Sequence, residues 1–196
     1  MPGMRIIGGR WRSRRLAQPP TTRTRPIPDR VKEALFSMLG SHYGCPGALP
    51  ALSVADVFAG SGSLGLEALS RGAVSCCFYE RDREALKALH RNIASLEADT
   101  VSSVNTRNAW IHAVSDDSGQ AFGLVFLDPP YRDSEDTSET GAVCQYLRRL
   151  ALMGGATPLV VLHHHESGCF SGVPASGWHL IKHRIFGTNA LSFLLR

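Results

Sequence analysis

Four residues at the end of an apolar run carry the clearest chemical signal in this sequence of 196 residues. The run Leu124–Leu127 stops at Asp128, and Pro129, Pro130 and Tyr131 follow. Neither proline has a backbone N–H to donate to a sheet, so a strand must end near Asp128. The Asp128 carboxylate and the Pro129 carbonyl can accept the two protons of an exocyclic amine. Such fixed acceptors favour a more tetrahedral, attacking nitrogen, while Tyr131 can stack on its base.

The same corner could serve folding alone, and a second motif helps to decide between these interpretations. Gly60, Gly62 and Gly65 have the G-x-G-x-x-G spacing between a strand pattern and a helix pattern, which is typical of a turn that approaches a ligand. Glu80 ends the next strand pattern, where its carboxylate can accept from both hydroxyls of a ribose. The alternative role for Glu80 is a helix cap, for which Asp82 is better placed. Adenosine occurs in both NAD and S-adenosylmethionine, so this pair alone does not distinguish them.

The elements that must position these residues alternate along the chain. We expect strands at 53–59, 73–80, 101–106, 122–128, 158–164, 178–186 and 190–196, and helices at 29–39 (capped by Asp29), 64–72, 82–96 and 141–152. This alternation predicts an α/β fold, with a mostly parallel sheet and helices on both faces. The last two strands lack a helix between them, which predicts an antiparallel hairpin at one edge. The tips of strands 53–59 and 122–128 should face one crevice.

The N-terminal 36 residues are strongly basic. They hold nine basic and two acidic residues, a net of +7, whereas the whole chain carries +4. A solvated tail is the plain alternative, but Ile6-Ile7, Gly8-Gly9 and Trp11 between the arginines indicate a short β-ribbon. We therefore predict an arm and connector at 1–27 and a catalytic domain at 28–196. The residues expected to contact RNA phosphates or bases are Arg5, Arg10, Trp11, Arg12, Arg14, Arg15, Arg25 and Arg30.

Composition sets wider limits. The chain is 43% hydrophobic with no run long enough to predict a transmembrane helix, and its Arg-rich start lacks the apolar core of a secretory signal. Five cysteines without C-x-x-C spacing favour a reducing, cytoplasmic setting. We expect a monomer. The consecutive His163, His164 and His165 point to alternating faces of a strand, so we expect no metal site. Trp110 and Trp178 are expected in the core.

Seven segments together resemble the bacterial RsmD family, which methylates the N2 amine of one guanine in 16S rRNA: "MRIIGGRWRSRRL", "RPIPDRVKEALF", "DVFAGSGSLGLEALSRGA", "YERDREALKALHRN", "RNAW", "FLDPPY" and "GTNALSFLLR". The resemblance implies a Rossmann-like, doubly wound sheet of seven strands with S-adenosylmethionine as methyl donor and no metal. It implies small ribosomal subunits, complete or in assembly, as substrate. The guanine would be held by Asp128, Pro129, Pro130 and Tyr131. The cofactor would be held by Asp56, Phe58, Gly60, Ser61, Gly62, Gly65, Glu80, Arg81, Asn108, Ala109 and Asp128.

The sequence departs from the family pattern at Pro28, in the loops 40–51 and 132–141, and at 163–165, where the family often has a glutamate soon after the strand. Two other classes of function remain open at this stage. One is a DNA or RNA amino-methyltransferase acting on adenine N6 or cytosine N4, although a DNA enzyme usually needs a target-recognition region. The other is a dinucleotide oxidoreductase or a non-catalytic RNA-binding module, neither of which would use both motifs.

Overall fold

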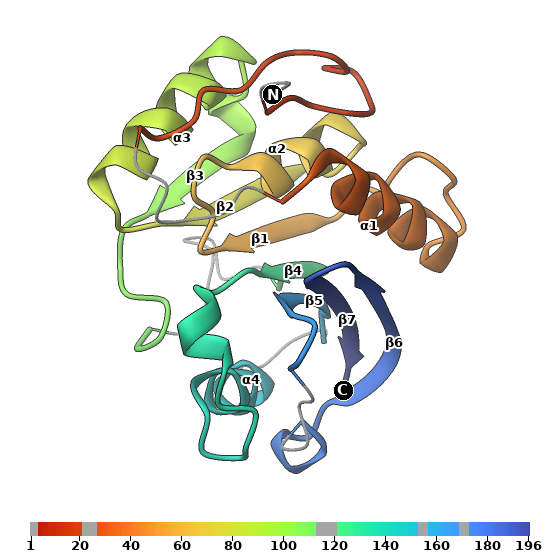
Figure 1. The fold of residues 1–196 in the computed structure, drawn as a ribbon. Coiled ribbons are helices and arrows are strands. Elements are labelled where there is room, and N and C mark those ends of the chain that lie inside the picture. The colour runs from red at the N-terminus through yellow and green to blue at the C-terminus, as the bar shows by residue number, and fades with distance from the viewer. Residues whose placement is uncertain (1–3, 21–26, 113–120, 153–156, 169–172) are drawn as a thin grey trace.

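The computed structural model describes residues 4–20, 27–112, 121–152, 157–168 and 173–196. In this part of the chain a seven-stranded sheet lies between two layers of helices (Figure 1). Its strands are β1 (Ser53–Val57), β2 (Ser75–Tyr79), β3 (Ser102–Asn105), β4 (Leu124–Leu127), β5 (Leu159–His165), β6 (His179–Phe186) and β7 (Asn189–Leu195). The helices are α1 (Asp29–His42), α2 (Ser63–Ser70), α3 (Arg83–Ser95) and α4 (Ala142–Leu152), with short 3-10 turns η1 (Asp99–Val101), η2 (Tyr131–Ser134) and η3 (Pro174–Ser176).

The order of the strands is β3-β2-β1-β4-β5-β7-β6. The first five are parallel, while β7 is antiparallel to both β5 and β6. The predicted parallel sheet and the C-terminal hairpin at its edge are therefore confirmed. The chain runs outward from β1 to β3 and then returns to place β4 on the other side of β1. In doubly wound sheets ligands bind at such a reversal, here the carboxyl ends of β1 and β4.

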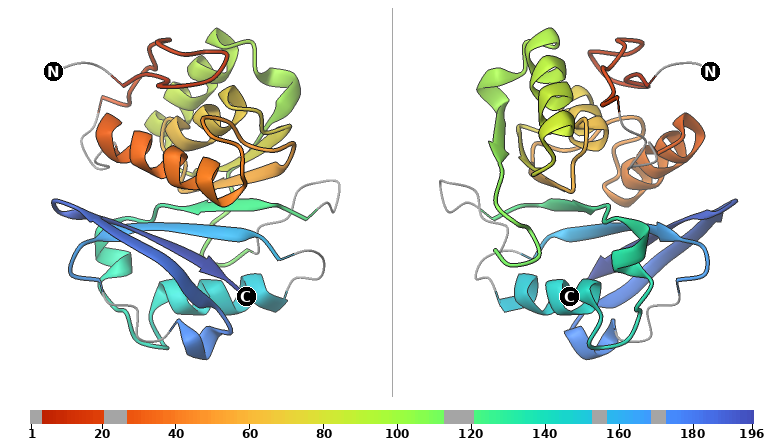
Figure 2. Two further views of the ribbon diagram at one scale, coloured as in Figure 1. Left: turned by 90° about the vertical axis from the view of Figure 1, so that its right-hand side faces the viewer. Right: turned by 60° about the vertical axis from the view of Figure 1, so that its left-hand side comes forward.

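Helices cover both faces of the sheet. The views in Figures 1 and 2 show α1, α2 and α3 on one face and α4 on the other. The buried hydrophobic residues form two clusters. Leu35, Leu66 and Phe126 belong to the cluster with α1, α2 and α3. Tyr146 and Trp178 belong to the cluster with α4. Trp178 is fully buried, which confirms its predicted core position. None of the helices in the described ranges is long and apolar enough to cross a membrane.

The start of α1 differs from the prediction. The extended residue at the N-cap position is Pro28, without a side-chain cap, and Asp29 is the first helical residue. Proline fixes its own φ, so it can set the entry to the helix without a capping oxygen. Asp29 instead pairs with Arg5 at 3.0 Å. By contrast, Asp82 caps α3 as expected, since its carboxylate accepts from two backbone N–H groups at 3.0 Å.

The predicted N-terminal ribbon is present in reduced form. The arm turns back on itself with a single antiparallel bridge between Arg5 and Arg15, and Ile6 donates to the carbonyl of Arg14 at 2.9 Å. The pairing is too short to form two strands. Ile6 and Leu16 are both buried in the core beside α2 and α3, so the described arm packs against the body. The connector at 21–26 lies outside the described residues.

Candidate functional site

The glycine turn after β1 has the geometry that its spacing predicts. Gly60 and Gly62 adopt positive φ angles of 56° and 83°, which side chains other than glycine rarely accept. Gly65 has a different reason, because a Cβ there would lie 2.4 Å from the ring of Phe78. The turn therefore requires small residues for its backbone shape and for the packing of α2 on β2.

Asp56 lies beneath this turn. Its carboxylate accepts from the backbone N–H of Gly65 at 2.8 Å, and the residue is 1% exposed. Burial raises the pKa of Asp56 to about 8, and the charges of Asp128 and Glu80 add to the effect, against the Gly65 hydrogen bond. The geometry gives Asp56 a supporting contact with the start of α2. Its direct contact with a cofactor stays a prediction, as does that of the neighbouring Ser61, which is buried.

Glu80 joins the glycine turn to the end of β2. One carboxylate oxygen accepts from the N–H of Gly60 at 2.8 Å, and the other accepts from Arg81 and Asp82 at 2.7 and 2.8 Å. Three backbone donors fix the carboxylate, while Asp82 alone caps the helix. The oxygen that accepts from Gly60 keeps one lone-pair site for a further donor such as a ribose hydroxyl. The residues present therefore fit the adenosine of S-adenosylmethionine.

A wall of aromatic rings follows β1 and β3. Phe58 has a positive φ of 65°, a strained angle for such a residue, and its ring lies 4.7 Å from that of Trp110. Asn108 accepts from the N–H of Trp110 at 3.1 Å, and Ala109 is buried. Trp110 also packs edge-on against Tyr146 at 5.9 Å and is half-buried, so it lies at the margin of the core as well as beside the site.

The corner after β4 lies beside the end of β1. Asp128 donates its backbone N–H to Val57 at 3.2 Å, so the strand pairing stops where the sequence predicts. Pro129 is buried and Pro130 half-buried, and Tyr131 begins the turn η2. The Asp128 side chain is 26% exposed, which leaves its carboxylate accessible to a substrate. The two motifs thus meet at one point of the sheet.

Sequence reasoning missed two partners of this corner. His163 lies 2.8 Å from the Asp128 carboxylate, and Asn189 accepts from the hydroxyl of Tyr131 at 3.0 Å. The usable signal was strand register, because Leu162 pairs with Leu127 and the next residue on each strand is His163 and Asp128. Within the described residues no group of three or more His, Cys, Asp or Glu side chains is arranged to hold a metal.

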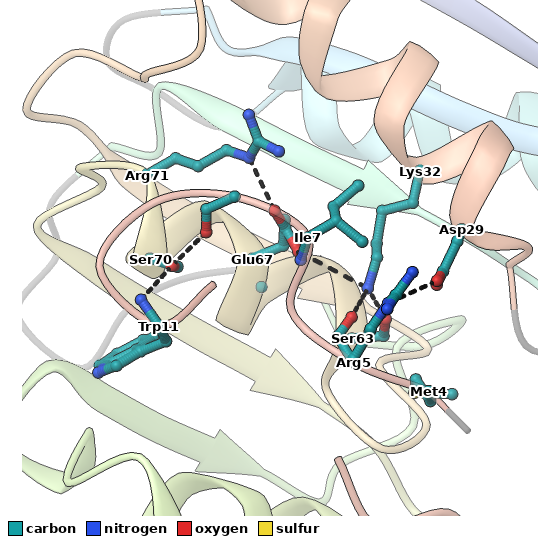
Figure 3. A network of polar contacts seen from close by, with 12 residues as sticks. Met4, Arg5, Ile7, Trp11, Asp29, Lys32, Ser63, Glu67, Ser70 and Arg71 are labelled. Carbon is teal, nitrogen blue, oxygen red and sulfur yellow. Dashed lines mark hydrogen bonds and ion pairs between the residues drawn. The ribbon is translucent and has the colours of Figure 1, made fainter. Parts of the chain in front are cut away.

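A polar network fixes the arm to α1 and α2 (Figure 3). The backbone N–H of Ile7 donates to Glu67 at 2.8 Å, and the ammonium of Lys32 donates to the carbonyl of Arg5 at 2.6 Å. Glu67 also pairs with Arg71 at 2.8 Å and lies 3.7 Å from Lys32. Burial lowers the pKa of Lys32 more than the Glu67 charge raises it. The network gives the arm a defined position.

The arginines predicted to contact RNA differ in how far the protein itself engages their side chains. Arg5 is engaged by Asp29, and Arg14 donates to the carbonyl of Ser95. The guanidinium of Arg10 stacks over Trp11 at 4.1 Å. The side chains of Arg12, Arg15 and Arg30 are exposed, whereas Arg25 lies outside the described residues. The described arm thus presents exposed cations, which suits a polyanion, whereas Trp11 is half-buried and packs against the core.

Comparison with known proteins agrees with this geometry. The model of a family described as conserved hypothetical protein 95 matches residues 4–195. YlbH of Bacillus subtilis (strain 168), a candidate rRNA methyltransferase, is 38% identical over 134 residues, which are 67% of this chain and 69% of that protein. Ribosomal RNA small subunit methyltransferase D of Escherichia coli (strain K12) is 43% identical over 129 residues, or 66% of this chain and 61% of that protein.

Solved structures extend the likeness to the whole chain. The structure of yhhF from Escherichia coli, a candidate methyltransferase, is 33% identical with a TM-score of 0.77, covering 98% of this chain and 97% of that one. A candidate methylase from Haemophilus influenzae is 27% identical with a TM-score of 0.71, covering 99% and 98%. The sheet described above is therefore the Rossmann-like α/β fold of methyltransferases.

Proposed function

The chain belongs to the RsmD family, whose model spans residues 4–195, and on that premise we propose that it is an S-adenosylmethionine-dependent rRNA methyltransferase. The finer proposal is that it methylates the exocyclic N2 of a guanine in 16S rRNA of the small ribosomal subunit. The observation that supports it is the contact of Asp128 with the end of β1, the strand that leads into the glycine turn, at the reversal of strand order.

S-adenosylmethionine supplies a methyl group already activated on a sulfonium, so the protein's task is to position the acceptor. Glu80 would hold the ribose. The Asp128 carboxylate and the Pro129 carbonyl would accept the two protons of the guanine amine, which aims its lone pair at the methyl carbon. Tyr131 would stack on the guanine after it leaves its neighbours in the RNA. The amine nitrogen would bond to the methyl carbon as the carbon–sulfur bond breaks, leaving S-adenosylhomocysteine as the thioether product, and would finally release one proton to Asp128 or to water.

The test is methyl transfer from a labelled donor to small subunits that lack this modification, followed by nucleoside analysis. We expect N2-methylguanosine as the product. Methylated adenosine or cytidine would overturn the N2 assignment in favour of another amino-methyltransferase. Titration calorimetry with S-adenosylhomocysteine and with NAD tests the cofactor separately, and tighter binding of NAD would overturn the reaction class.

Variants of Asp128 test the mechanism. Asp128→Ala removes an acceptor aimed at the reacting nitrogen, so the methylation rate should fall by ~10²–10³ while S-adenosylhomocysteine binding barely changes. Asp128→Asn keeps one carbonyl acceptor and should retain partial activity. If both variants match the parent on small subunits, the corner after β4 is structural and the mechanism is wrong.

A further inference from the structure

His163 stands at the end of β5 beside the proposed amine acceptor. Strands β4 and β5 pair in parallel with Leu127 opposite Leu162, so the next residues, Asp128 and His163, lie side by side. The Nδ1 atom of His163 is 2.8 Å from Oδ1 of Asp128, and the histidine is 3% exposed. The contact therefore follows from the register of the sheet.

The opposite ring nitrogen has a second partner. Nε2 of His163 lies 2.9 Å from Oδ1 of Asn189 on β7, and this oxygen also accepts from the Tyr131 hydroxyl. The orientation of the amide is set by its nitrogen, which faces the carbonyl of Phe186 at 3.5 Å. Carboxylate and amide oxygens accept hydrogen bonds and do not donate them. With the amide in this orientation and Asp128 ionised, both nitrogens of His163 donate, which favours an imidazolium.

The surrounding groups favour this charge. Asp128 approaches from β4, Tyr131 from η2 and Asn189 from β7, while His164 and His165 are neighbours on the same strand. Burial lowers the pKa of His163, but the charge of Asp128 and the two hydrogen bonds outweigh it, so the pKa is raised above 6.5.

The next histidine is in the opposite situation. His164 is fully buried and bonded to Ser192 at 2.8 Å and to a backbone carbonyl. Burial, aided by the charges of the nearby histidines and opposed by the hydrogen bond to the backbone, lowers the pKa of His164 to about 4. The two residues therefore separate cleanly in a titration, because His164 stays neutral where His163 is charged.

We propose that His163 is a cationic positioning residue for methyl transfer. Its imidazolium fixes one oxygen of Asp128 and leaves the other to accept from the target amine. Through Asn189 the same ring is joined to Tyr131, so the amine acceptor and the stacking ring form one network. This inference rests on the proposed function, in which Asp128 and Tyr131 hold the guanine.

The pH dependence follows from the direction of the shift. A histidine whose pKa is raised in the folded protein contributes its full share of stability below its ordinary value of 6.5, and this share is lost as the pH rises through the raised pKa. The proposed positioning of Asp128 also needs the charged ring. The turnover rate should therefore decline on the alkaline side as His163 loses its proton.

The first experiment is independent of activity. In the full chain labelled with ¹⁵N and ¹³C in histidine, NMR reports the protonation of each ring, and His163→Asn assigns the signal. We expect both nitrogens of His163 to be protonated at pH 7, with a midpoint above 6.5. A neutral His163 at pH 7 would overturn the proposal, whether or not the protein methylates RNA.

The second experiment compares matched variants on small subunits. His163→Asn keeps a donor near the position of Nδ1 without the charge, and we expect it to lose the alkaline decline. His163→Ala should lower kcat about 10-fold or more with unchanged S-adenosylhomocysteine affinity. His42→Asn is the control, since His42 is exposed at the end of α1. An unaltered alkaline decline in His163→Asn would overturn the proposal, whereas a parent without activity would instead refute the proposed function.

Discussion

Replacing Lys32 by methionine should destabilise the protein through the arm. The Lys32 ammonium is fully buried and donates to the Arg5 carbonyl at 2.6 Å and to Ser63 at 3.0 Å. Removing one partner of a buried ion pair costs about 3–5 kcal/mol of unfolding free energy. Glu67 would keep its ion pair with Arg71 and its hydrogen bond from the Ile7 N–H, both at 2.8 Å. We therefore expect a loss at the low end of this range, about 3 kcal/mol. For a chain of this size that corresponds to a fall in Tm of ~6–12 °C.

The assay is thermal and urea unfolding of Lys32→Met beside a surface control. Lys87→Met removes an ion pair with Glu84 whose lysine is 73% exposed, and it should change the unfolding free energy by less than about 0.5 kcal/mol. The double variant Lys32→Met with Glu67→Gln should lose further stability, because Glu67 also holds Arg71 and the Ile7 N–H. A single variant that melts with the parent, or a double variant more stable than Lys32→Met, would refute this account of the arm.

Two further predictions concern ligand binding. Glu80→Ala should weaken S-adenosylhomocysteine binding by roughly 1.5–3 kcal/mol in calorimetry while RNA binding persists, because a charged acceptor is lost; unchanged affinity in the folded variant would remove Glu80 from the site. Arg12→Gln with Arg15→Gln should weaken RNA binding uniformly and reduce the slope of log affinity against log salt by about 1 for each lost phosphate contact. If neither affinity nor slope changes, these exposed arginines do not contact phosphate.

Local sequence patterns predicted the turns and the helix cap that follow β1, β2 and β4. Two prolines stopped β4 at Leu127, and the spacing of Gly60 and Gly65 placed a turn before α2. Asp82 was recognisable as a cap because a carboxylate before a helix satisfies its first N–H groups. Each of these signals acts within a few residues, so one stretch of sequence suffices to find it.

Contacts between distant segments were harder to foresee. The pairing of Asp128 with His163 depends on the register of β4 and β5, and Asn189 joins them from the last strand. A run of three histidines suggests a metal site, and no neighbouring residue in the sequence shows that His163 and His164 have different partners. In the arm, the charge pattern concealed that Ile6 and Leu16 are core residues. Deleting the arm would therefore expose core as well as remove charge, which makes point variants the better test.

The length of α2 limits the insertions and deletions that this chain can accept. Its first turn follows the glycine turn at Gly62, and its last residue, Ser70, receives the N–H of Trp11 at 3.0 Å and that of Arg10 at 2.9 Å. A Cβ on Gly9 would lie 1.9 Å from the Ser70 carbonyl oxygen, so the arm packs against the end of α2 with no room for a side chain. One inserted residue would rotate Ser70 by about 100° relative to Ser63. The length of α2, eight residues, is thus fixed by its contacts at both ends.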